Sequence, residues 1–317
     1  MKIIGTGSSL PSRQVTNEDL SKFLDTSDEW IFQRTGIRSR HVISTESLED
    51  MAADAVNKAL DMAGMKAADI DLCICSNVVN EYITPGLSCI IAWKTGMKCP
   101  GIDINCACPG CVYGMDMVDK YISSGSVKNI MLVAAEEPSR MTAWTDRSTC
   151  VLFGDGAAAA VCTVGDSFIG SRLSAQPDPT RIWEYHLLEP TPYIDKEEHA
   201  SPLQMKGRDV FKYAVLACID DIEALLEKTG YKLEDISCFL IHQANQRIVD
   251  AIRERLGVPE EKFPTNIEDH GNVSSASCLI LMDELNRKGT FKNGDLLMFS
   301  GFGAGLQSGA ALLKWEI

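Results

Sequence analysis

An internal repeat constrains the fold of this chain more than any other feature of its sequence. The segment 60–75, with a helix end, a glycine stop and an apolar strand, recurs 166 residues later as segment 226–241. Two further echoes follow in the same order: 124–133 matches 288–299, and 156–161 matches 309–313. Chance would explain a single echo, but several in one order indicate a duplicated α/β unit with mixed sheets covered by helices. The predicted halves are residues 1–166 and 167–317.

The composition predicts a large globular core, since 45% of the 317 residues are hydrophobic. A net charge of −14 argues against nucleic acid as a partner. No apolar run reaches membrane-spanning length, and the strand-like start of the sequence lacks the pattern of a signal peptide. The 12 cysteines therefore indicate reduced thiols in the cytoplasm rather than a disulfide framework.

Cys108 is the candidate nucleophile because it lies between a predicted strand and a predicted helix. Segment 101–104 is typical of a short strand, and Pro109 favours the first position of a helix. This spacing predicts Cys108 at the helix cap, where free backbone N–H groups and the helix dipole favour thiolate over thiol. The helix is supported by an apolar stripe, which consists of Cys111, Met115, Val118 and Ile122.

The two neighbouring cysteines lack this position. We interpret Cys106 and Cys111 as small core residues, as most cysteines in so cysteine-rich a chain are expected to be. Together with Cys108 they could also suggest a zinc site, but three thiols without a nearby fourth ligand are a weak signal. We therefore predict that the protein binds no metal.

The repeat also predicts which residues share a cavity with Cys108. Ser76 at the end of its strand corresponds to His242, and the helix start at Cys108 corresponds roughly to segment 272–275. Ligands of α/β sheets bind beyond the carboxyl ends of the strands, so Cys108, His242 and Asn272 are expected to face one cavity. A glycine-rich bend at 299–305 is suited to bring a backbone N–H close to a bound oxygen. The remaining histidines are interpreted as structural residues: His41, His186, His199 and His270.

Short motifs are spread over nearly the whole chain. In order they are 26–31 (Thr-Ser-Asp-Glu-Trp-Ile), 34–38 (Arg-Thr-Gly-Ile-Arg), 107–110 (Ala-Cys-Pro-Gly), 146–147 (Asp-Arg), 153–156 (Phe-Gly-Asp-Gly), 242–245 (His-Gln-Ala-Asn), 270–272 (His-Gly-Asn) and 301–305 (Gly-Phe-Gly-Ala-Gly). Together they resemble the β-ketoacyl-acyl carrier protein synthase III family of the thiolase superfamily. The resemblance implies an α/β class fold, the thiolase-like duplicated α-β-α-β-α five-layered fold, and a homodimer. It also implies a triad of Cys108, His242 and Asn272.

The chemistry implied by the resemblance is a decarboxylative Claisen condensation that starts fatty acid synthesis. Cys108 thiolate attacks the thioester of an acyl-coenzyme A, and the N–H groups of Cys108 and Ala304 form the oxyanion hole. His242 and Asn272 then stabilise the enolate that malonyl-acyl carrier protein forms as it loses carbon dioxide. The resulting carbanion attacks acyl-Cys108. No cofactor is implied, because acyl-coenzyme A is a substrate.

The resemblance further implies binding residues. Trp30 is expected to stack on the adenine of coenzyme A, and Arg34 and Arg147 to contact its nucleotide end; an interface tryptophan and surface ion pairs are the alternatives. A local concentration of basic residues is a candidate docking surface for the acidic carrier protein, with a merely solvated helix face as the alternative. It comprises Lys206, Arg208, Lys212, Arg247, Arg253 and Arg255.

Two departures from the family pattern are expected to affect the substrate entrance. Segment 307–309 is Gln-Ser-Gly where the family often has Thr-Trp-Gly, and segment 176–185 lacks the usual glycine-containing loop. In the family, the segment that matches 82–85 crosses the dimer interface and closes the acyl pocket of the partner. Thr84 is smaller than the aromatic residue typical there, so we expect room for branched or longer primers.

Two other functions remain open from the sequence. An acyltransferase or condensing enzyme of a specialised pathway could use the same triad on another nucleophile. A non-catalytic protein that binds thiols or a metal through its cysteines is the third possibility, although no metal needs Asn272 or the glycine-rich bend.

Overall fold

Two mixed sheets form the scaffold of the protein, and four strands of each share one topology. The structure is a computed structural model that describes residues 1–185 and 200–317. The first sheet has the order β1 (Lys2–Ser9), β7 (Gly156–Thr163), β6 (Ile130–Glu136), β4 (Leu72–Ser76) and β5 (Gly101–Ile104). The second has the order β8 (Phe168–Ala175), β13 (Gln307–Lys314), β12 (Leu296–Gly303) and β11 (Cys238–Ile241). In both, a parallel pairing, β6 with β4 or β12 with β11, adjoins two antiparallel pairings, and the first sheet has β5 as an additional strand parallel to β4. This shared arrangement of four strands confirms the predicted duplication.

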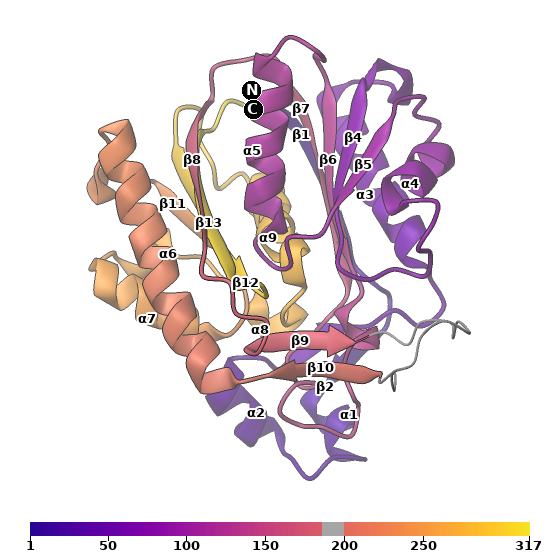
Figure 1. Ribbon diagram of the computed structural model, residues 1–317, viewed down its shortest axis with the longest axis vertical. Coiled ribbons are helices and arrows are strands. Elements are labelled where there is room, and N and C mark those ends of the chain that lie inside the picture. The colour runs from indigo at the N-terminus through magenta and orange to yellow at the C-terminus, as the bar shows by residue number, and fades with distance from the viewer. Residues whose placement is uncertain (186–199) are drawn as a thin grey trace, which may run out of the picture.

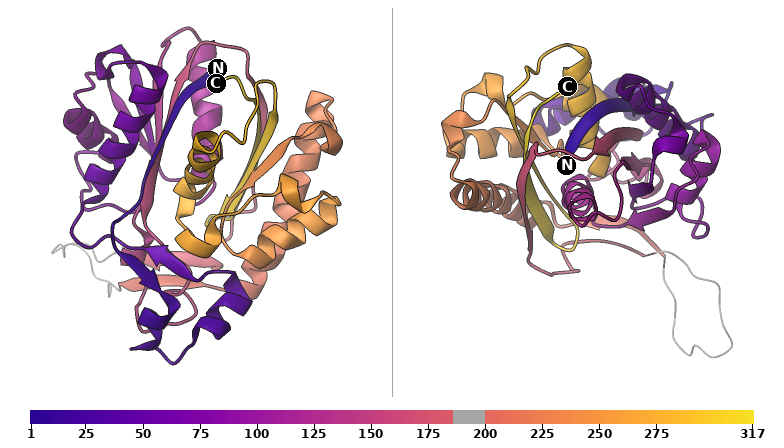
Figure 2. Two further views of the ribbon diagram at one scale, coloured as in Figure 1. Left: turned by 180° about the vertical axis from the view of Figure 1, so that it is seen from behind. Right: turned by 90° about the horizontal axis from the view of Figure 1, so that it is seen from above.

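Helices complete five layers, as predicted (Figure 1). The central layer between the sheets holds α5 (Gly110–Ser123) and α9 (Ser277–Arg287). One outer layer consists of α3 (Leu48–Ala63) and α4 (Leu87–Thr95), and the other consists of α6 (Gly207–Thr229) and α7 (Gln246–Leu256). Figure 2 shows the same layers from behind and from above, with the two chain termini close together.

The buried strands are continuous apolar runs because helices cover both of their faces. Along β6, Ile130 and Leu132 pack into the central layer, whereas Met131 and Val133 pack under α3 and α4. Alternate side chains of a strand point to opposite faces, so one run of residues contributes to two separate cores.

The two halves interlock through the central helices. Although α5 belongs to the first half of the sequence, it packs against β13 and β8, while α9 packs against β1 and β7. The predicted boundary at residues 166 and 167 falls in the connection between β7 and β8. Division of the chain into two domains at that point stays a prediction.

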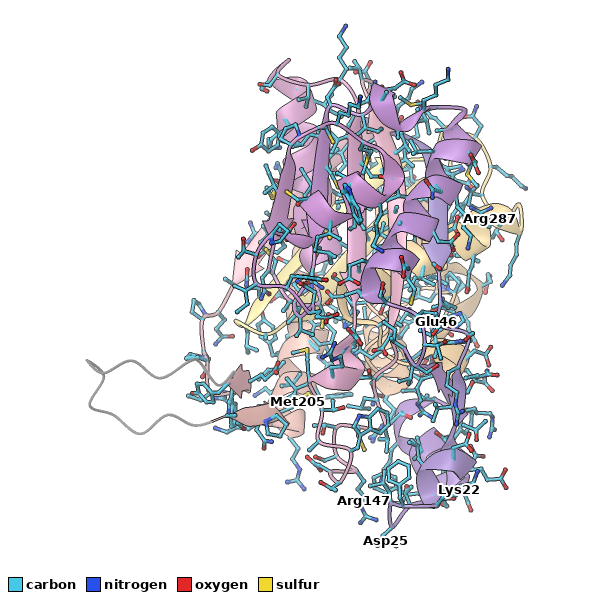
Figure 3. The ribbon with its side chains drawn as sticks, turned by 90° about the vertical axis from the view of Figure 1, so that its right-hand side faces the viewer. Lys22, Asp25, Glu46, Arg147, Met205 and Arg287 are labelled. Carbon is cyan, nitrogen blue, oxygen red and sulfur yellow. The ribbon has the colours of Figure 1, made fainter. Side chains whose placement is uncertain are left out.

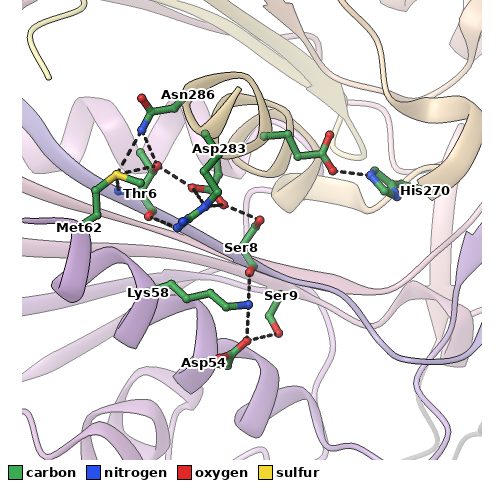
Figure 4. A network of polar contacts seen from close by, with 11 residues as sticks. Thr6, Ser8, Ser9, Asp54, Lys58, Met62, His270, Asp283 and Asn286 are labelled. Atoms are coloured by element: carbon green, nitrogen blue, oxygen red, sulfur yellow. Dashed lines mark hydrogen bonds and ion pairs between the residues drawn. The ribbon is translucent and has the colours of Figure 1, made fainter. Parts of the chain in front are cut away.

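A buried carboxylate joins the halves at α9 (Figure 4). Asp283 accepts hydrogen bonds from the hydroxyls of Thr6 at 2.7 Å and Ser8 at 2.6 Å, both on β1. The Arg287 guanidinium, one turn further along the helix, donates to both oxygens of Asp283 at 3.0 Å. Because each oxygen has partners, the carboxylate is held in the core without an unsatisfied charge.

Smaller elements gather at one end of the sheets, in the lower part of Figure 1. They include β2 (Gln14–Thr16), α1 (Asn17–Ser21), α2 (Asp28–Thr35), β3 (Ser39–His41), β9 (Ile182–Tyr185), β10 (Ser201–Met205) and α8 (Ile267–His270). Single 3₁₀ turns are η1 (Ala67–Asp69), η2 (Pro138–Arg140), η3 (Leu233–Asp235), η4 (Glu260–Lys262) and η5 (Ser274–Ala276). All 12 cysteines are free thiols. None of the helices in the described ranges combines the length and apolarity that a membrane span requires.

Candidate active site

A cavity of about 310 Å³ lies between the ends of the sheets and these smaller elements. Cys108, His242, Asn272 and Ala304 all line it, so the residues that the sequence analysis grouped together do meet. The rest of the wall is largely apolar and includes Val78, Met141, Val151, Leu152, Phe153, Ile182, Leu203, Met205, Val210, Phe211, Ile248 and Phe302. Such a wall suits an aliphatic ligand with its polar atoms at one end.

Cys108 lies on a tight turn ahead of α5. Ala107 takes a left-handed φ of 52°, and the helix begins at Gly110 with Pro109 as its N-cap. The prediction that Cys108 itself is the cap is therefore wrong by one residue. The end of β12 presses on this turn: a Cβ on Gly303 would lie 2.8 Å from Pro109 Cδ and 2.9 Å from the Cys108 nitrogen. Only glycine allows that approach.

The resting state of Cys108 is the thiol. Burial is the main cause that raises the pKa of its sulfur to about 12, and the nearby Glu136 charge contributes to this rise. The Ser274 hydroxyl lies 3.6 Å from Sγ and acts in the opposite direction, but to a smaller extent. Our prediction that the free protein favours the thiolate is thus wrong, because desolvation outweighs the helix start.

His242 follows β11 and faces the cavity as a neutral ring. Its backbone N–H donates to the Ser300 carbonyl at 2.8 Å, and the edge of its ring meets Phe302 with a centroid distance of 5.5 Å. Burial lowers the pKa of His242 to about 3. Within the described part of the chain, neither ring nitrogen has a hydrogen-bond partner. A buried imidazole of this kind offers one donor and one acceptor to a ligand.

Asn272 is fixed by contacts with segment 152–154. Its backbone N–H donates to the Leu152 carbonyl at 2.8 Å, and its carbonyl accepts from Gly154 at 3.1 Å. A Cβ on Gly154 would lie 2.2 Å from the His270 carbonyl, which explains the glycine in the Phe-Gly-Asp-Gly motif. The Asn272 Oδ1 accepts from the Ser274 backbone at 2.8 Å, so its Nδ2 hydrogens remain the donors for the cavity.

No serine side chain caps the helix that follows Asn272. The segment starts with η5, and α9 begins only at Ser277 without a capping side chain. The Ser275 hydroxyl instead donates to the buried carboxylate of Glu136 at 2.5 Å. The carboxylate of Glu136 is a stronger acceptor than a backbone group, so the Ser275 side chain bonds to it and does not cap the helix.

Trp30, Arg34 and Arg147 meet at the outer end of the cavity. The guanidinium carbons of Arg34 and Arg147 lie 4.3 Å and 4.9 Å from the centre of the Trp30 ring. Arg147 also donates to Asp25, and Figure 3 shows this pair at the lower tip of the molecule. An aromatic ring beside two cations suits a purine with phosphates.

The basic residues predicted for docking lie on two adjacent helices, α6 and α7. Lys212, Arg247 and Arg255 are exposed, as are Lys206 and Arg208 just before and at the start of α6. Arg253 is half-buried, and its side chain has 23% relative exposure, which leaves it less available to a partner. Their role in docking stays a prediction.

Of the two segments that depart from the family pattern, 176–185 contributes to the described cavity wall and 307–309 does not. Ile182 of segment 176–185 lines the cavity, whereas Gln307, Ser308 and Gly309 are absent from its described lining. Ser308 is buried and donates to Asp221 at 2.6 Å, which gives it a structural role. Thr84 is exposed and does not line the cavity of its own chain.

The other histidines have protein partners where they are described. His270 Nε2 lies 2.6 Å from Glu284 Oε1, and His41 Nδ1 lies 2.7 Å from the Pro11 carbonyl. His186 and His199 lie outside the described residues. In the described ranges, no group of three or more His, Cys, Asp or Glu side chains could hold a metal ion.

Glu136 and Ser274 were not predicted as residues of the site. Glu136 is fully buried at the end of β6 and accepts hydrogen bonds from Ser274 at 3.2 Å, from Ser275 and from the Val78 backbone at 3.1 Å. One signal was available: an acidic residue ends an otherwise apolar strand. A buried charge in such a place needs partners and is a candidate for function.

Known proteins share both the sequence and the fold. Residues 102–177 match the family described as 3-oxoacyl-[acyl-carrier-protein (ACP)] synthase III, and residues 226–315 match its C-terminal counterpart. A β-ketoacyl-[acyl-carrier-protein] synthase III of Clostridium perfringens is 41% identical, over 99% of this chain and 98% of that protein.

Two solved structures extend this likeness to three dimensions. The 3-oxoacyl-[acyl-carrier-protein] synthase III of Aquifex aeolicus superimposes with a TM-score of 0.92 at 38% identity, over 99% of each chain. The priming β-ketosynthase of the R1128 polyketide biosynthetic pathway also gives 0.92, at 34% identity over 99% of this chain and 96% of the other. These similarities show that the chain belongs to the β-ketoacyl-[acyl-carrier-protein] synthase III family, thiolase-like acyltransferases that initiate fatty acid biosynthesis.

Proposed function

We propose that the protein joins an acyl-coenzyme A primer to malonyl-acyl carrier protein through an acyl-Cys108 intermediate. The product is a 3-oxoacyl-acyl carrier protein, and carbon dioxide and coenzyme A are released. The observation that supports this most is a cavity in which a thiol, an unpartnered buried imidazole and an amide meet. This set of groups matches a thioester whose carbonyl oxygen needs donors.

In the first half-reaction Cys108 attacks the primer thioester. The carbonyl oxygen becomes negative and is stabilised by the backbone N–H groups of Cys108 and Ala304. Both residues line the cavity, and Gly303 brings the end of β12 against the Cys108 turn. Collapse of this intermediate releases coenzyme A and leaves the acyl group on Sγ.

In the second half-reaction malonyl-acyl carrier protein loses carbon dioxide. His242 and Asn272 donate hydrogen bonds to its thioester oxygen and stabilise the enolate. The neutral state of His242 suits this role, because a neutral ring with a hydrogen on the nitrogen that faces the oxygen donates without a charge to desolvate. The carbanion then attacks acyl-Cys108.

The test is to incubate the protein with several acyl-coenzyme A species and identify the labelled peptide by mass spectrometry. We expect the acyl group on the peptide that contains Cys108, and none in Cys108→Ala. Carbon dioxide release should then depend on malonyl-acyl carrier protein. Labelling of another residue, or no labelling, would contradict the proposal.

Substrate binding and assembly are part of the same proposal. Trp30, Arg34 and Arg147 hold the nucleotide of coenzyme A, and Lys212, Arg247, Arg253 and Arg255 form the carrier-protein surface. A homodimer in the cytoplasm is proposed as well. It is supported by exposed apolar side chains on the first half, namely Tyr82, Ile83 and Trp93, with relative exposures of 45%, 96% and 79%.

Primer choice follows from the dimer. Thr84, on the exposed segment beside Ile83, is proposed to reach the acyl pocket of the partner subunit and to leave room for branched or longer chains. A panel of acyl-coenzyme A primers tests this, with Thr84→Phe as the variant that fills the space. Activity confined to acetyl-coenzyme A in the unmodified protein would refute it.

A second candidate is a condensing enzyme of a specialised pathway. The R1128 priming β-ketosynthase, with its TM-score of 0.92, is the observation that favours it. The two functions are distinguished by a second step after the labelling experiment, in which turnover is measured with different malonyl-loaded carrier proteins. Turnover with the carrier protein of fatty acid synthesis supports the first function, and turnover only with another carrier supports the second.

A further inference from the structure

We propose that Ser274 and Glu136 take the proton of the Cys108 thiol as it attacks the thioester. This inference deepens the proposed function, and it rests on the acyl-transfer half-reaction. It starts from a chain of three groups: the Ser274 Oγ lies 3.6 Å from Cys108 Sγ and 3.2 Å from Glu136 Oε1. A hydroxyl has one hydrogen, so it can donate to only one of these neighbours at a time.

The carboxylate is the stronger acceptor of the two. When Glu136 is ionised, the Ser274 hydroxyl donates to it, and an oxygen lone pair is left facing the thiol. The S–H bond of Cys108 then has an acceptor at contact distance. Ser274 is held in this place by its own backbone, with a φ of 48° and an N–H that donates to Asn272 Oδ1 at 2.8 Å.

The proton transfer balances as follows. The Cys108 hydrogen passes to Ser274 Oγ, while the Ser274 hydrogen passes to Glu136 Oε1. The sulfur electron pair forms the bond to the acyl carbon. When the tetrahedral intermediate collapses, the bond from that carbon to the coenzyme A sulfur breaks. The Glu136 carboxylic acid gives its proton back to Ser274 Oγ, and the Ser274 hydrogen passes to the departing coenzyme A sulfur, which leaves as a thiol.

The protonation behaviour of the neighbours supports this route over one through the imidazole. Burial raises the pKa of Glu136 to about 7, which matches a general base at neutral pH. Burial lowers the pKa of His242 to about 3, which makes it a weak base. Cys75 on β4 and Cys108 are the titratable groups that sense the Glu136 charge, whereas the facing residues Gly156, Ser274 and Ser275 do not titrate.

Two variants and one matched control test the relay. Glu136→Gln keeps the shape and removes the base, and Ser274→Ala removes the link. Ser275→Ala is the control, because this hydroxyl also donates to Glu136 Oε1 but has no described contact with Cys108. The measurement is the single-turnover rate of Cys108 acylation by an acyl-coenzyme A at pH 7.5. Ser274→Gly, which suits a φ of 48°, replaces the Ala variant if that one fails to fold.

We expect a loss of about 10²-fold in Glu136→Gln and Ser274→Ala, the lower end of general-base contributions. Ser275→Ala should lose much less and should move the pH inflection upward, because the Ser275 hydrogen bond lowers the pKa of Glu136. The wild-type rate should rise with pH through an inflection near 7 that Glu136→Gln lacks, and it should be lower in D₂O. A purely electrostatic role predicts the opposite sign, because removal of the charge lowers the Cys108 pKa. Acylation as fast or faster in Glu136→Gln therefore overturns the relay but leaves the function standing. No acylation of the wild type overturns both.

Discussion

The duplication has produced two related clusters, and only one of them faces the cavity. Each cluster combines one residue from the turn before a central helix with two residues at the ends of neighbouring strands. The turn before α5 meets the ends of β11 and β12, and the turn before α9 meets the ends of β4 and β6. The open cluster consists of Cys108, His242 and Gly303, and the closed cluster consists of Ser275, Ser76 and Glu136. Their members come from opposite halves of the chain, because each turn packs against the strand ends of the other sheet.

The two turns share their backbone geometry. Ala107 and Ser274 both take a left-handed φ, 52° and 48°. In each turn an asparagine two residues earlier accepts from their N–H: Asn105 at 3.3 Å and Asn272 at 2.8 Å. One local structure has thus been used twice.

The difference between the clusters lies in which polar groups have partners. In the closed cluster the Ser76 hydroxyl donates to Ser275 at 3.0 Å, and Ser275 donates to Glu136. In the open cluster the ring nitrogens of His242 have no described hydrogen-bond partner, and Gly303 contributes no side chain. The same backbone therefore gives a satisfied network in one place and a site that needs a ligand in the other.

The largest expected effect is on acyl labelling, when the turn residue of the open cluster is replaced by the residue type found in the closed cluster. Cys108→Ser puts the closed-cluster residue type in the open cluster, and we expect acyl labelling to fall below detection, because a hydroxyl is a far weaker nucleophile than a thiol. Mass spectrometry of the labelled peptide measures it. Cys106→Ser is the control, and its labelling should persist. Labelling of Cys108→Ser near the wild-type rate would contradict the assignment.

The next largest effect is on decarboxylation, when His242 at the end of β11 is replaced. His242→Ser should lower decarboxylation about 10²- to 10³-fold, the cost of one lost oxyanion donor. Acylation of Cys108 should change much less, since the relay runs through Ser274. Carbon dioxide release and peptide labelling, measured on the same samples, separate the two steps. Ser76→Ala, at the related position, should leave decarboxylation close to wild type. Equal loss of both steps in His242→Ser would argue against separate roles.

The clusters should also respond oppositely to pH. Burial lowers the pKa of His242 from 6.5 to about 3, so below pH 6.5 the unfolded chain binds a proton that the folded chain refuses, and stability falls. Burial raises the pKa of Glu136 from 4.5 to about 7, so its contribution is full below pH 4.5 and is lost as pH rises through 7.

Urea denaturation at pH 7.5 and pH 5 of the wild type, His242→Ser and Glu136→Gln tests this contrast. Relative to wild type, His242→Ser should gain about 2 kcal/mol of unfolding free energy on acidification. Glu136→Gln should lose a similar amount relative to wild type over the same change. Parallel pH curves for the three proteins would show that burial does not shift these groups.

The smallest effect concerns a pair of carboxylates on the central helices. Asp283 on α9 bonds β1 and Arg287, and Asp116 on α5 bonds Ser171 of β8 and Lys120. Asp283 is 1% exposed and Asp116 is 20% exposed. We expect Asp283→Ala to cost about 2 kcal/mol and Asp116→Ala less than about 1 kcal/mol, measured by urea denaturation. A larger loss in Asp116→Ala would mean that burial does not set the difference.

The local elements of the fold were predictable because they depend on near neighbours in sequence. The apolar stripe of α5 is buried as expected, and Gly64 and Gly230 end α3 and α6 in left-handed conformations. The helix starts were less predictable. Pro109 became the cap of α5 and Ser275 turned to Glu136, since contacts from distant segments compete with local capping.

By itself the sequence determined the duplicated α/β unit and the cavity shared by Cys108, His242 and Asn272, whereas the five layers were implied by the family resemblance. Repeats and strand ends follow from residue order, so they can be read from one chain. Only the tertiary structure decided that Cys108 rests as a thiol and that Glu136 lies within reach of it through Ser274. Protonation depends on which groups from remote segments surround an atom and how fully they exclude water, and residue order does not specify either.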